Sequence, residues 1–311
     1  MSLAAPPRPL LSKGDTVAVV SPGFGVRAAD LAAGVRRLEE LGFRVVTGAH
    51  VLDRDGYLAG SDAARAGDLN RALARPDVRA VWFARGGYGA ARLLDRVRWE
   101  HLDRAPKALI GYSDVTALFA AASSRTACAC LYGPVVAELG DPRHYHLGSL
   151  RGALRGEPSV VRFAQARVVR HGRARGPLVG GNLTVLIHLL GTRYAPDPRG
   201  SILFLEDVGE PAYRLDRMLT HLRMSGWLRG VAGVVLGSFE PAPRRSFLRD
   251  RPVVDLVRET FSPLGVPVVT GLRAGHVPGK HTLPLGGDAH LDTRAGTLRA
   301  LPRTPRRRPR R

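Results

Sequence analysis

Cysteine is scarce in this chain of 311 residues, and long apolar runs are missing. The two cysteines, Cys128 and Cys130, are too few for a disulfide framework or a zinc site. Neighbours that close on an extended segment point to opposite faces, so we expect no disulfide between them. No window reaches the about 18 uninterrupted apolar residues of a membrane span, and the N-terminus lacks a secretory signal pattern. These absences predict a protein of the reducing cytoplasm with no membrane contact.

Lysine is also scarce, although the chain is strongly basic. Its 47 basic residues exceed the 27 acidic ones and give a formal net charge of +20, which would usually indicate nucleic acid. Only three of the basic residues are lysine, and the arginines are scattered, as a GC-rich coding sequence produces regardless of function. Aromatic residues make up 6% and do not alternate with basic ones as on RNA-binding surfaces. We expect no nucleic-acid partner, and we interpret 301–311 as a solvated basic tail, with weak anion contacts as the alternative.

Short apolar runs alternate with helical patterns in the first half of the chain. This alternation predicts an α/β domain over residues 1–140, with a mostly parallel sheet of the flavodoxin or Rossmann type. Ligands bind beyond the carboxyl ends of the strands in such domains. The turns Ser21–Gly25 and Arg85–Gly89 and the residue Ser113 all follow predicted strands, so they could converge on one crevice.

The second half has a different character. Residues 141–176 are polar and rich in arginine, glycine and proline, which indicates a linker. Two of its histidines, His144 and His146, are not accompanied by a cluster of carboxylates or cysteines, so we predict no metal site. Residues 177–300 then predict a smaller mixed β/α domain that ends in a small antiparallel element. We expect the active site at the interface of the two domains.

Ser113 follows a predicted strand and precedes a predicted helix. A serine at this position is ordinarily an N-cap. It could also be a nucleophile on a tight turn, with the first amides of the helix directed at the site. Gly111 supplies the first glycine of a G-x-S-x-G pattern, but Val115 replaces the second. The residues alone leave both interpretations open.

Gly86 and Gly87 lie in a turn where the backbone can approach a substrate closely. The rival interpretation is a phosphate-binding loop. The lysine and the spacing of a P-loop are missing, and the dinucleotide fingerprint is incomplete. We therefore predict no nucleotide and no other cofactor.

Several motifs together resemble the LD-carboxypeptidases of serine peptidase family S66, which include muramoyl-tetrapeptide carboxypeptidases and microcin-immunity peptidases. They occur in the family's order over about residues 13–300, nearly the whole chain. Besides GYSD at Ser113, they are GYLAGSDAARAGDLNRAL (56–73), ARGGYGAARLLD (84–95), GGNLTVLIHLLGT (180–192), LFLEDVGEPAYRLDRMLTHL (203–222) and GHVPGKHTLPLG (275–286).

The resemblance implies a Ser-Glu-His triad. Ser113 would be the nucleophile, His276 the general base and acid, and Glu206 the carboxylate that orients the histidine. Glu210 is close enough in sequence to be confused with Glu206. We favour Glu206 because it ends the apolar run 202–205, where burial would fix a carboxylate in place.

The resemblance and the turn geometry also imply oxyanion donors from the backbone, namely the amide of Asp114 and an amide of Gly86 or Gly87. The chain departs from the family at 132–134, where Tyr-Gly-Pro replaces the His-Gly-Pro of many relatives. That histidine is not a triad member, so the chemistry should survive, while the substrate preference is less well defined.

The implied reaction releases terminal D-alanine from murein tetrapeptides by hydrolysing its amide bond to an L-centred diamino acid. In relatives this enzyme is a cytoplasmic homodimer that recycles cell-wall peptides. The alternative is the microcin-immunity branch, which hydrolyses peptidyl- or aminoacyl-nucleotides, although EPAYRLDRML (210–219) looks more like the tetrapeptide branch. Binding a free terminal carboxylate suits arginine, but the sequence does not indicate which one.

Overall fold

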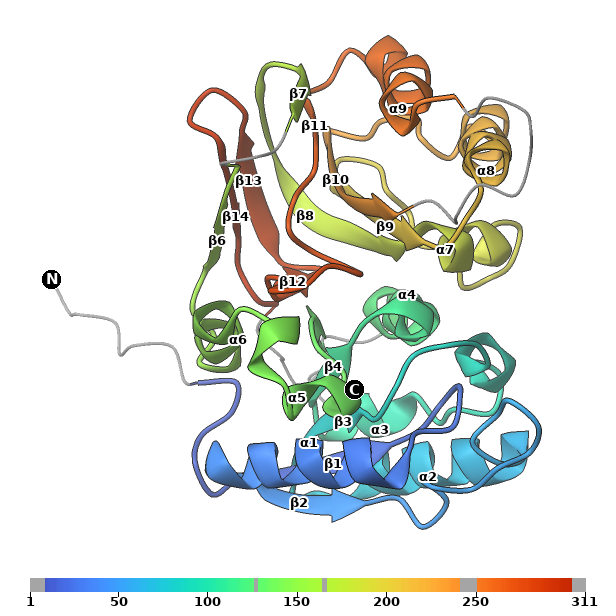
Figure 1. Ribbon diagram of the computed structural model, residues 1–311, viewed down its shortest axis with the longest axis vertical. Helices are drawn as coiled ribbons and strands as arrows, with labels where there is room; N and C mark the ends of the chain where they lie inside the picture. Colours follow the sequence, from blue (N-terminus) through green and yellow to red (C-terminus); the bar gives the residue numbers. More distant parts are fainter. Residues whose placement is uncertain (1–8, 126–127, 164–166, 241–250, 304–311) are drawn as a thin grey trace, which may run out of the picture.

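The computed structural model describes residues 9–125, 128–163, 167–240 and 251–303, and every structural statement below refers to these residues. Two sheets lie one above the other (Figure 1). The strands of the first sheet are β1 (Thr16–Val20), β2 (Arg44–Thr47), β3 (Val78–Phe83), β4 (Ala108–Gly111), β5 (Ala129–Tyr132) and β12 (Leu283–Leu285).

The first sheet has the order β12-β5-β4-β3-β1-β2. Strands β1 to β5 are parallel, and their order 2-1-3-4-5 is that of flavodoxin-like domains, which confirms the predicted fold class. Strand β12 comes from the far end of the chain and pairs antiparallel with β5, Leu283 opposite Tyr132. The sequence had placed this segment in the second domain.

Helices cover both faces of the first sheet. Apolar side chains alternate along the strands, so Val17 and Val19 of β1 face one helical layer and Ala18 and Val20 face the other. Burial on both faces explains why β1, β3, β4 and β5 are almost continuously apolar. The helices are α1 (Ala28–Glu40), α2 (Asp62–Ala74), α3 (Glu100–Arg104), α4 (Thr116–Arg125), α5 (Val136–Leu139) and α6 (Leu147–Leu154).

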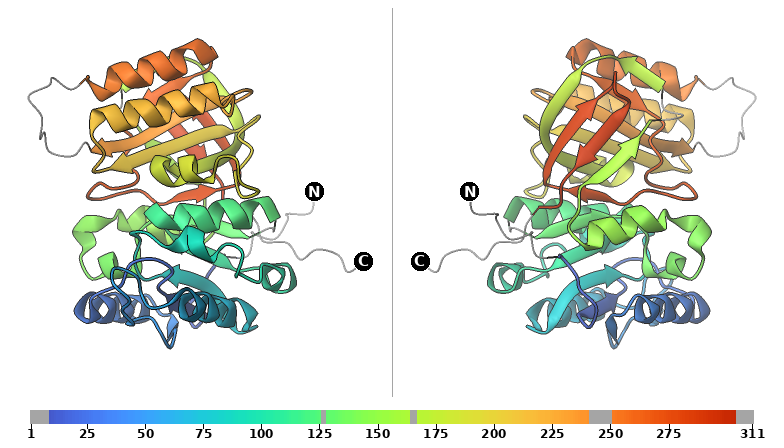
Figure 2. Two further views of the ribbon diagram at one scale, coloured as in Figure 1. Left: turned by 90° about the vertical axis from the view of Figure 1, so that its right-hand side faces the viewer. Right: turned by 90° about the vertical axis from the view of Figure 1, so that its left-hand side faces the viewer.

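The second sheet has the order β6-β14-β13-β8-β9-β10-β11-β7. Its centre, β8 to β11, is parallel, and both flanks are antiparallel, so the predicted mixed domain is present. The strands are β6 (Ser159–Arg162), β7 (Arg167–Arg170), β8 (Arg173–Asn182), β9 (Ile202–Val208), β10 (Gly233–Glu240), β11 (Val268–Thr270), β13 (Asp288–Asp292) and β14 (Thr297–Ala300). Helices α7 (Leu183–Leu189), α8 (Ala212–Met224) and α9 (Val253–Phe261) pack against one face (Figure 2).

Most of the segment 141–176 has regular structure, so the prediction of a linker was wrong there. It contains α6, β6, β7 and the beginning of β8. β6 and β7 lie at the two edges of the second sheet, and the side chains of β6 alternate between buried and exposed. Three of the arginines that suggested a linker, Arg162, Arg167 and Arg170, occupy exposed positions of these edge strands, where charge helps to keep edges from pairing with other chains.

The two cysteines differ from the sequence-based expectation. Both are buried and unbridged, but their Sγ atoms lie 3.6 Å apart instead of on opposite faces. Cys128 precedes β5, which begins at Ala129, so the alternation of an extended strand does not govern its side chain. Within the described residues, no helix has the length and apolarity that crossing a membrane requires.

Candidate active site

A pocket of about 660 Å³ lies at the carboxyl ends of β3 and β4, between the two domains. The first domain contributes Phe24 from the turn Ser21–Gly25, residues 85–87 from the turn Arg85–Gly89, and Ser113. The second domain contributes Val208 and His276. Because the strands are parallel, three features that are distant in sequence meet at one edge of the sheet.

Ser113 lies two residues after the end of β4, at the start of a short 3₁₀ turn (Ser113–Val115) that leads into α4. Its φ is +66°, and among the described residues it is the one non-glycine residue with a positive φ. Such a conformation costs about 1–3 kcal/mol and persists only where the surroundings enforce it. The backbone N–H of Ser113 donates a hydrogen bond to the Tyr132 hydroxyl at 3.2 Å, so the turn is fixed from β5.

Gly86 lies against the side chain of Ser113. A Cβ added to Gly86 would be 3.0 Å from the Ser113 Cβ and 3.3 Å from its Oγ. A side chain at position 86 would crowd the serine, so glycine suits the close approach of this loop. The sequence-based oxyanion candidates Gly86 and Gly87 thus line the same pocket as Ser113, and Asp114 follows it in the turn.

Glu206 and His276 form a buried pair. The Glu206 side chain, near the end of β9, has no exposed surface, and its Oε2 lies 2.7 Å from the His276 Nδ1. The same oxygen accepts the His276 backbone N–H at 3.2 Å. Glu210 instead lies near the surface beside Arg214, 3.6 Å away. Of the two carboxylates that the sequence left close together, Glu206 is the one that contacts the histidine.

Gly275 makes room for this pair. It has a φ of +93°, and a Cβ there would lie 2.4 Å from the Glu206 Oε2. The imidazole of His276 also packs on the Tyr112 ring, with 4.8 Å between the ring centroids. The described contacts include no direct hydrogen bond between the Ser113 hydroxyl and the imidazole, although both groups line the pocket. Such bonds often shorten only when substrate binds.

Tyr132 links the two halves of the site. Its hydroxyl accepts the Ser113 N–H and donates to the Glu206 Oε1 at 2.6 Å. Asn182, at the end of β8, donates to the same carboxylate oxygen at 3.3 Å. Burial and the neighbouring Glu206 charge raise the pKa of Tyr132, which keeps the phenol protonated as a donor. Sequence reasoning noted the unusual Tyr-Gly-Pro, but it did not find this role or that of Asn182.

A second buried cluster supports the wall of the pocket. Lys280 is almost fully buried, and its Nζ lies 2.6 Å from the Glu138 Oε1 and 4.2 Å from the centroid of the Tyr112 ring. The Tyr112 hydroxyl donates to the same oxygen at 2.8 Å. Because Tyr112 carries His276 on its ring, this cluster fixes the surface on which the imidazole rests. Tyr112 and Lys280 belong to motifs of the family resemblance, but those motifs did not indicate the contact with Glu138.

The Asp114 side chain ties the serine turn to the neighbouring loop. It is buried, and its Oδ2 accepts the backbone N–H of Ala90 at 2.8 Å. Burial raises the pKa of the Asp114 carboxyl to about 6, although the Ala90 and Gly89 amides and the Arg65 charge oppose the shift. Between about pH 4 and pH 6 the folded chain therefore holds a proton at this carboxyl that the unfolded chain releases.

We expect Asp114→Asn to gain stability relative to wild type as the pH rises. The contribution of Asp114 to the free energy of unfolding is fully present below its unfolded pKa of 3.8 and is lost as the pH rises through about 6. Asparagine stays neutral and can still accept the Ala90 amide. Urea unfolding at about pH 4.5 and about pH 7.5 measures the difference in the free energy of unfolding between the variant and wild type. If this difference is the same at both pH values, the raised pKa of Asp114 is contradicted.

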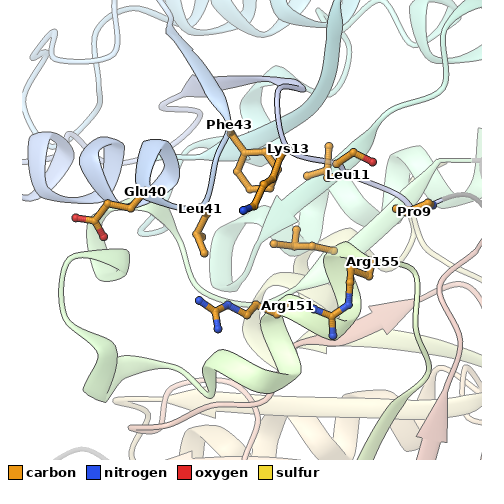
Figure 3. A pocket seen from close by; sticks show the side chains of 10 residues that line it. Pro9, Leu11, Lys13, Glu40, Leu41, Phe43, Arg151 and Arg155 are labelled. Atoms are coloured by element: carbon orange, nitrogen blue, oxygen red, sulfur yellow. The ribbon is translucent and has the colours of Figure 1, made fainter.

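A second pocket, of about 530 Å³, lies at the amino ends of β1 and β2, on the opposite edge of the sheet (Figure 3). Lys13, Arg151 and Arg155 surround it over an apolar floor that includes Phe43. Its lining includes no histidine, so it lacks a general base of the kind found in the first pocket. Among the described residues, no group of three or more His, Cys, Asp or Glu side chains could hold a metal ion.

Two family models match the chain, the LD-carboxypeptidase N-terminal domain over residues 17–133 and the LD-carboxypeptidase C-terminal domain over residues 175–291. A Streptomyces coelicolor protein is 43% identical over 295 residues, covering 93% of this chain and 94% of that protein. The murein tetrapeptide carboxypeptidase of Pseudomonas aeruginosa is 36% identical over 290 residues, covering 89% of this chain and 92% of that protein.

Solved structures are similar over almost the full length. The muramoyltetrapeptide carboxypeptidase from Oxalobacter formigenes has a TM-score of 0.83 at 31% identity, covering 93% of this chain and 99% of that one. The microcin C7 self-immunity protein MccF has a TM-score of 0.84 at 24% identity, covering 94% of this chain and 97% of that one, and it shows the fold alone. The two family models and the full-length relatives agree, and the chain belongs to the LD-carboxypeptidase family, serine peptidase family S66, as a peptidase of that family.

Proposed function

We propose that the chain is a serine-type LD-carboxypeptidase that releases terminal D-alanine from murein tetrapeptides, with Ser113, His276 and Glu206 as its triad. The observation that carries the proposal is the pairing of the buried Glu206 with His276, which lines one pocket together with a serine on a left-handed turn. The names of the Pseudomonas and Oxalobacter relatives support the substrate.

The reaction follows from the orientation of the imidazole. Glu206 accepts the Nδ1–H of His276, which leaves Nε2 unprotonated and able to take a proton. In our mechanism, Nε2 removes the Ser113 hydroxyl proton while Oγ attacks the carbonyl carbon of the diamino acid. The protonated histidine then gives its proton to the nitrogen of D-alanine as the C–N bond breaks. Water, activated by the same histidine, hydrolyses the ester and restores the serine.

The tetrahedral intermediate carries a negative oxygen that needs donors. We assign this role to the backbone amides of Asp114 and of Gly86 or Gly87, which line or adjoin the pocket beside Ser113. The Ser113 amide is less suited to the role because it already donates to Tyr132. The cytoplasmic location and the homodimer stay predictions.

The test is D-alanine release from a murein tetrapeptide, with the same peptide ending in L-alanine as the matched control. We expect release of D-alanine at least about 10²-fold faster than release of L-alanine, because a site built for one configuration leaves polar groups unpaired with the other. If a folded protein releases neither amino acid, the tetrapeptide assignment fails. Hydrolysis of an aminoacyl- or peptidyl-nucleotide by the same protein would then support the microcin-immunity alternative.

A further inference from the structure

We propose that Arg85 forms the subsite for the free terminal carboxylate of the substrate. This inference rests on the proposed function, because a carboxypeptidase must recognise the charged end of a peptide beside its nucleophile. The sequence offers too many arginines to select one. The pocket contains two, Arg27 and Arg85, and their contacts distinguish them.

The position of Arg85 suits a carboxylate next to the scissile bond. Arg85 directly precedes Gly86, whose backbone passes against the Ser113 side chain. In a peptide that ends in one residue beyond the scissile bond, the terminal carboxylate carbon lies only about 3–4 Å from the attacked carbonyl carbon. An anchor for it must therefore be close to the nucleophile, and Arg85 is the arginine on the adjacent loop.

The ion pairs of the pocket leave Arg85 available. Arg27 makes two hydrogen bonds to Asp30, at 2.7 and 2.8 Å, and so already holds a carboxylate. Glu138 accepts from the buried Lys280 and from the Tyr112 hydroxyl. Arg85 donates from Nη1 to the carbonyl of Gly25 at 3.1 Å, and no carboxylate among the described residues forms an ion pair with it. A guanidinium has five N–H donors, so several remain for a ligand.

The charge of Arg85 affects the pKa values of two groups that line the pocket, Asp30 and Tyr112. The pKa of Asp30 is lowered first by its hydrogen bond from Arg27 and, to a smaller degree, by the Arg85 charge. Burial raises the pKa of Tyr112, and the Arg85 charge opposes that rise. The Arg85 charge thus lies near enough to both Asp30 and Tyr112 to affect their pKa values, and Arg85 lines the pocket with them. A planar guanidinium can hold a carboxylate with two parallel hydrogen bonds.

The experiment compares two substrates and two arginines. The substrates are the murein tetrapeptide with its free carboxylate and the same peptide with a C-terminal amide. The variants are Arg85→Gln and Arg151→Gln. Arg151 is exposed in the pocket on the opposite edge of the sheet, so its replacement removes the same charge from a distant place (Figure 3).

We expect wild type to favour the acid over the amide by about 10- to 100-fold in kcat/KM, the size expected for a charge-assisted contact. Arg85→Gln should lose most of that factor on the acid and change little on the amide. Arg151→Gln should behave as wild type on both substrates. Arg85→Lys should recover part of the preference, because lysine restores the charge without the paired geometry.

Two results would overturn the subsite while leaving the proposed function intact. Arg85→Gln could slow both substrates equally, which would mean that Arg85 only holds the loop at Gly25. Arg151→Gln could lose as much of the preference for the acid over the amide as Arg85→Gln does. That result would mean that the net charge of +20 attracts anions to the whole protein. If wild type itself releases no D-alanine from the acid, the proposed function fails, and the subsite fails with it.

Discussion

Replacing Ser113 by alanine is expected to slow D-alanine release by about 10⁵-fold or more, because the acyl-enzyme can no longer form. The fold should remain. Alanine keeps the Cβ that lies against Gly86, and its backbone N–H can still donate to Tyr132. The measurement is kcat for the tetrapeptide, with urea unfolding of the same preparation as the check on folding.

Ser12→Ala is the control for this substitution. Ser12 is an exposed serine in the pocket on the opposite edge of the sheet, so its hydroxyl is far from the proposed chemistry. We expect its kcat to equal that of wild type. If Ser113→Ala keeps more than about one tenth of the wild-type kcat, Ser113 is not the nucleophile.

Replacing Glu206 by glutamine is expected to lower kcat by about 10⁴-fold with a much smaller change in KM. The carboxylate accepts four hydrogen bonds, two at each oxygen. A glutamine has one oxygen and one NH₂ group in the same space. If its oxygen stays with Tyr132 and Asn182, its NH₂ faces the imidazole and stabilises the tautomer with a bare Nδ1. The proton then sits on Nε2, where it blocks the transfer from Ser113.

Glu210→Gln is the matched control, because it makes the same chemical change four residues along the chain. Glu210 lies beside Arg214 near the surface, so we expect its kcat within about twofold of wild type. A larger loss in Glu210→Gln than in Glu206→Gln would reverse the assignment of the triad carboxylate. Equal kcat values in wild type and Glu206→Gln would remove Glu206 from the mechanism.

The first sheet could be predicted because its information is local. Four of its parallel strands, β1, β3, β4 and β5, are buried on both faces and read as short apolar runs, and Ser113 lies just after one of them. The site residues Glu206 and His276 are different. Their contact joins positions 70 residues apart, and the motifs placed them by resemblance, not by any periodicity in the chain.

The features that the sequence missed depend on tertiary contacts. Tyr132 was noted only as a departure from the family pattern, yet its hydroxyl connects Ser113 to Glu206. The pairing of Lys280 with Glu138 spans 142 residues, and no local pattern indicates it. The segment 141–176 was predicted as a linker because of its arginine, glycine and proline content. That prediction overlooked the alternation of buried and exposed side chains along β6.

The pairing of β12 with β5 has a consequence for synthesis on the ribosome. A nascent chain presents β5 with one open edge until residues 283–285 have emerged, long after the rest of the first sheet is available. The carboxylate that accepts the Tyr132 hydroxyl also comes from the later half. Completion of the first sheet and assembly of the proposed triad therefore both wait for the end of the chain, so an interrupted translation product would be an inert fragment and not an unregulated hydrolase.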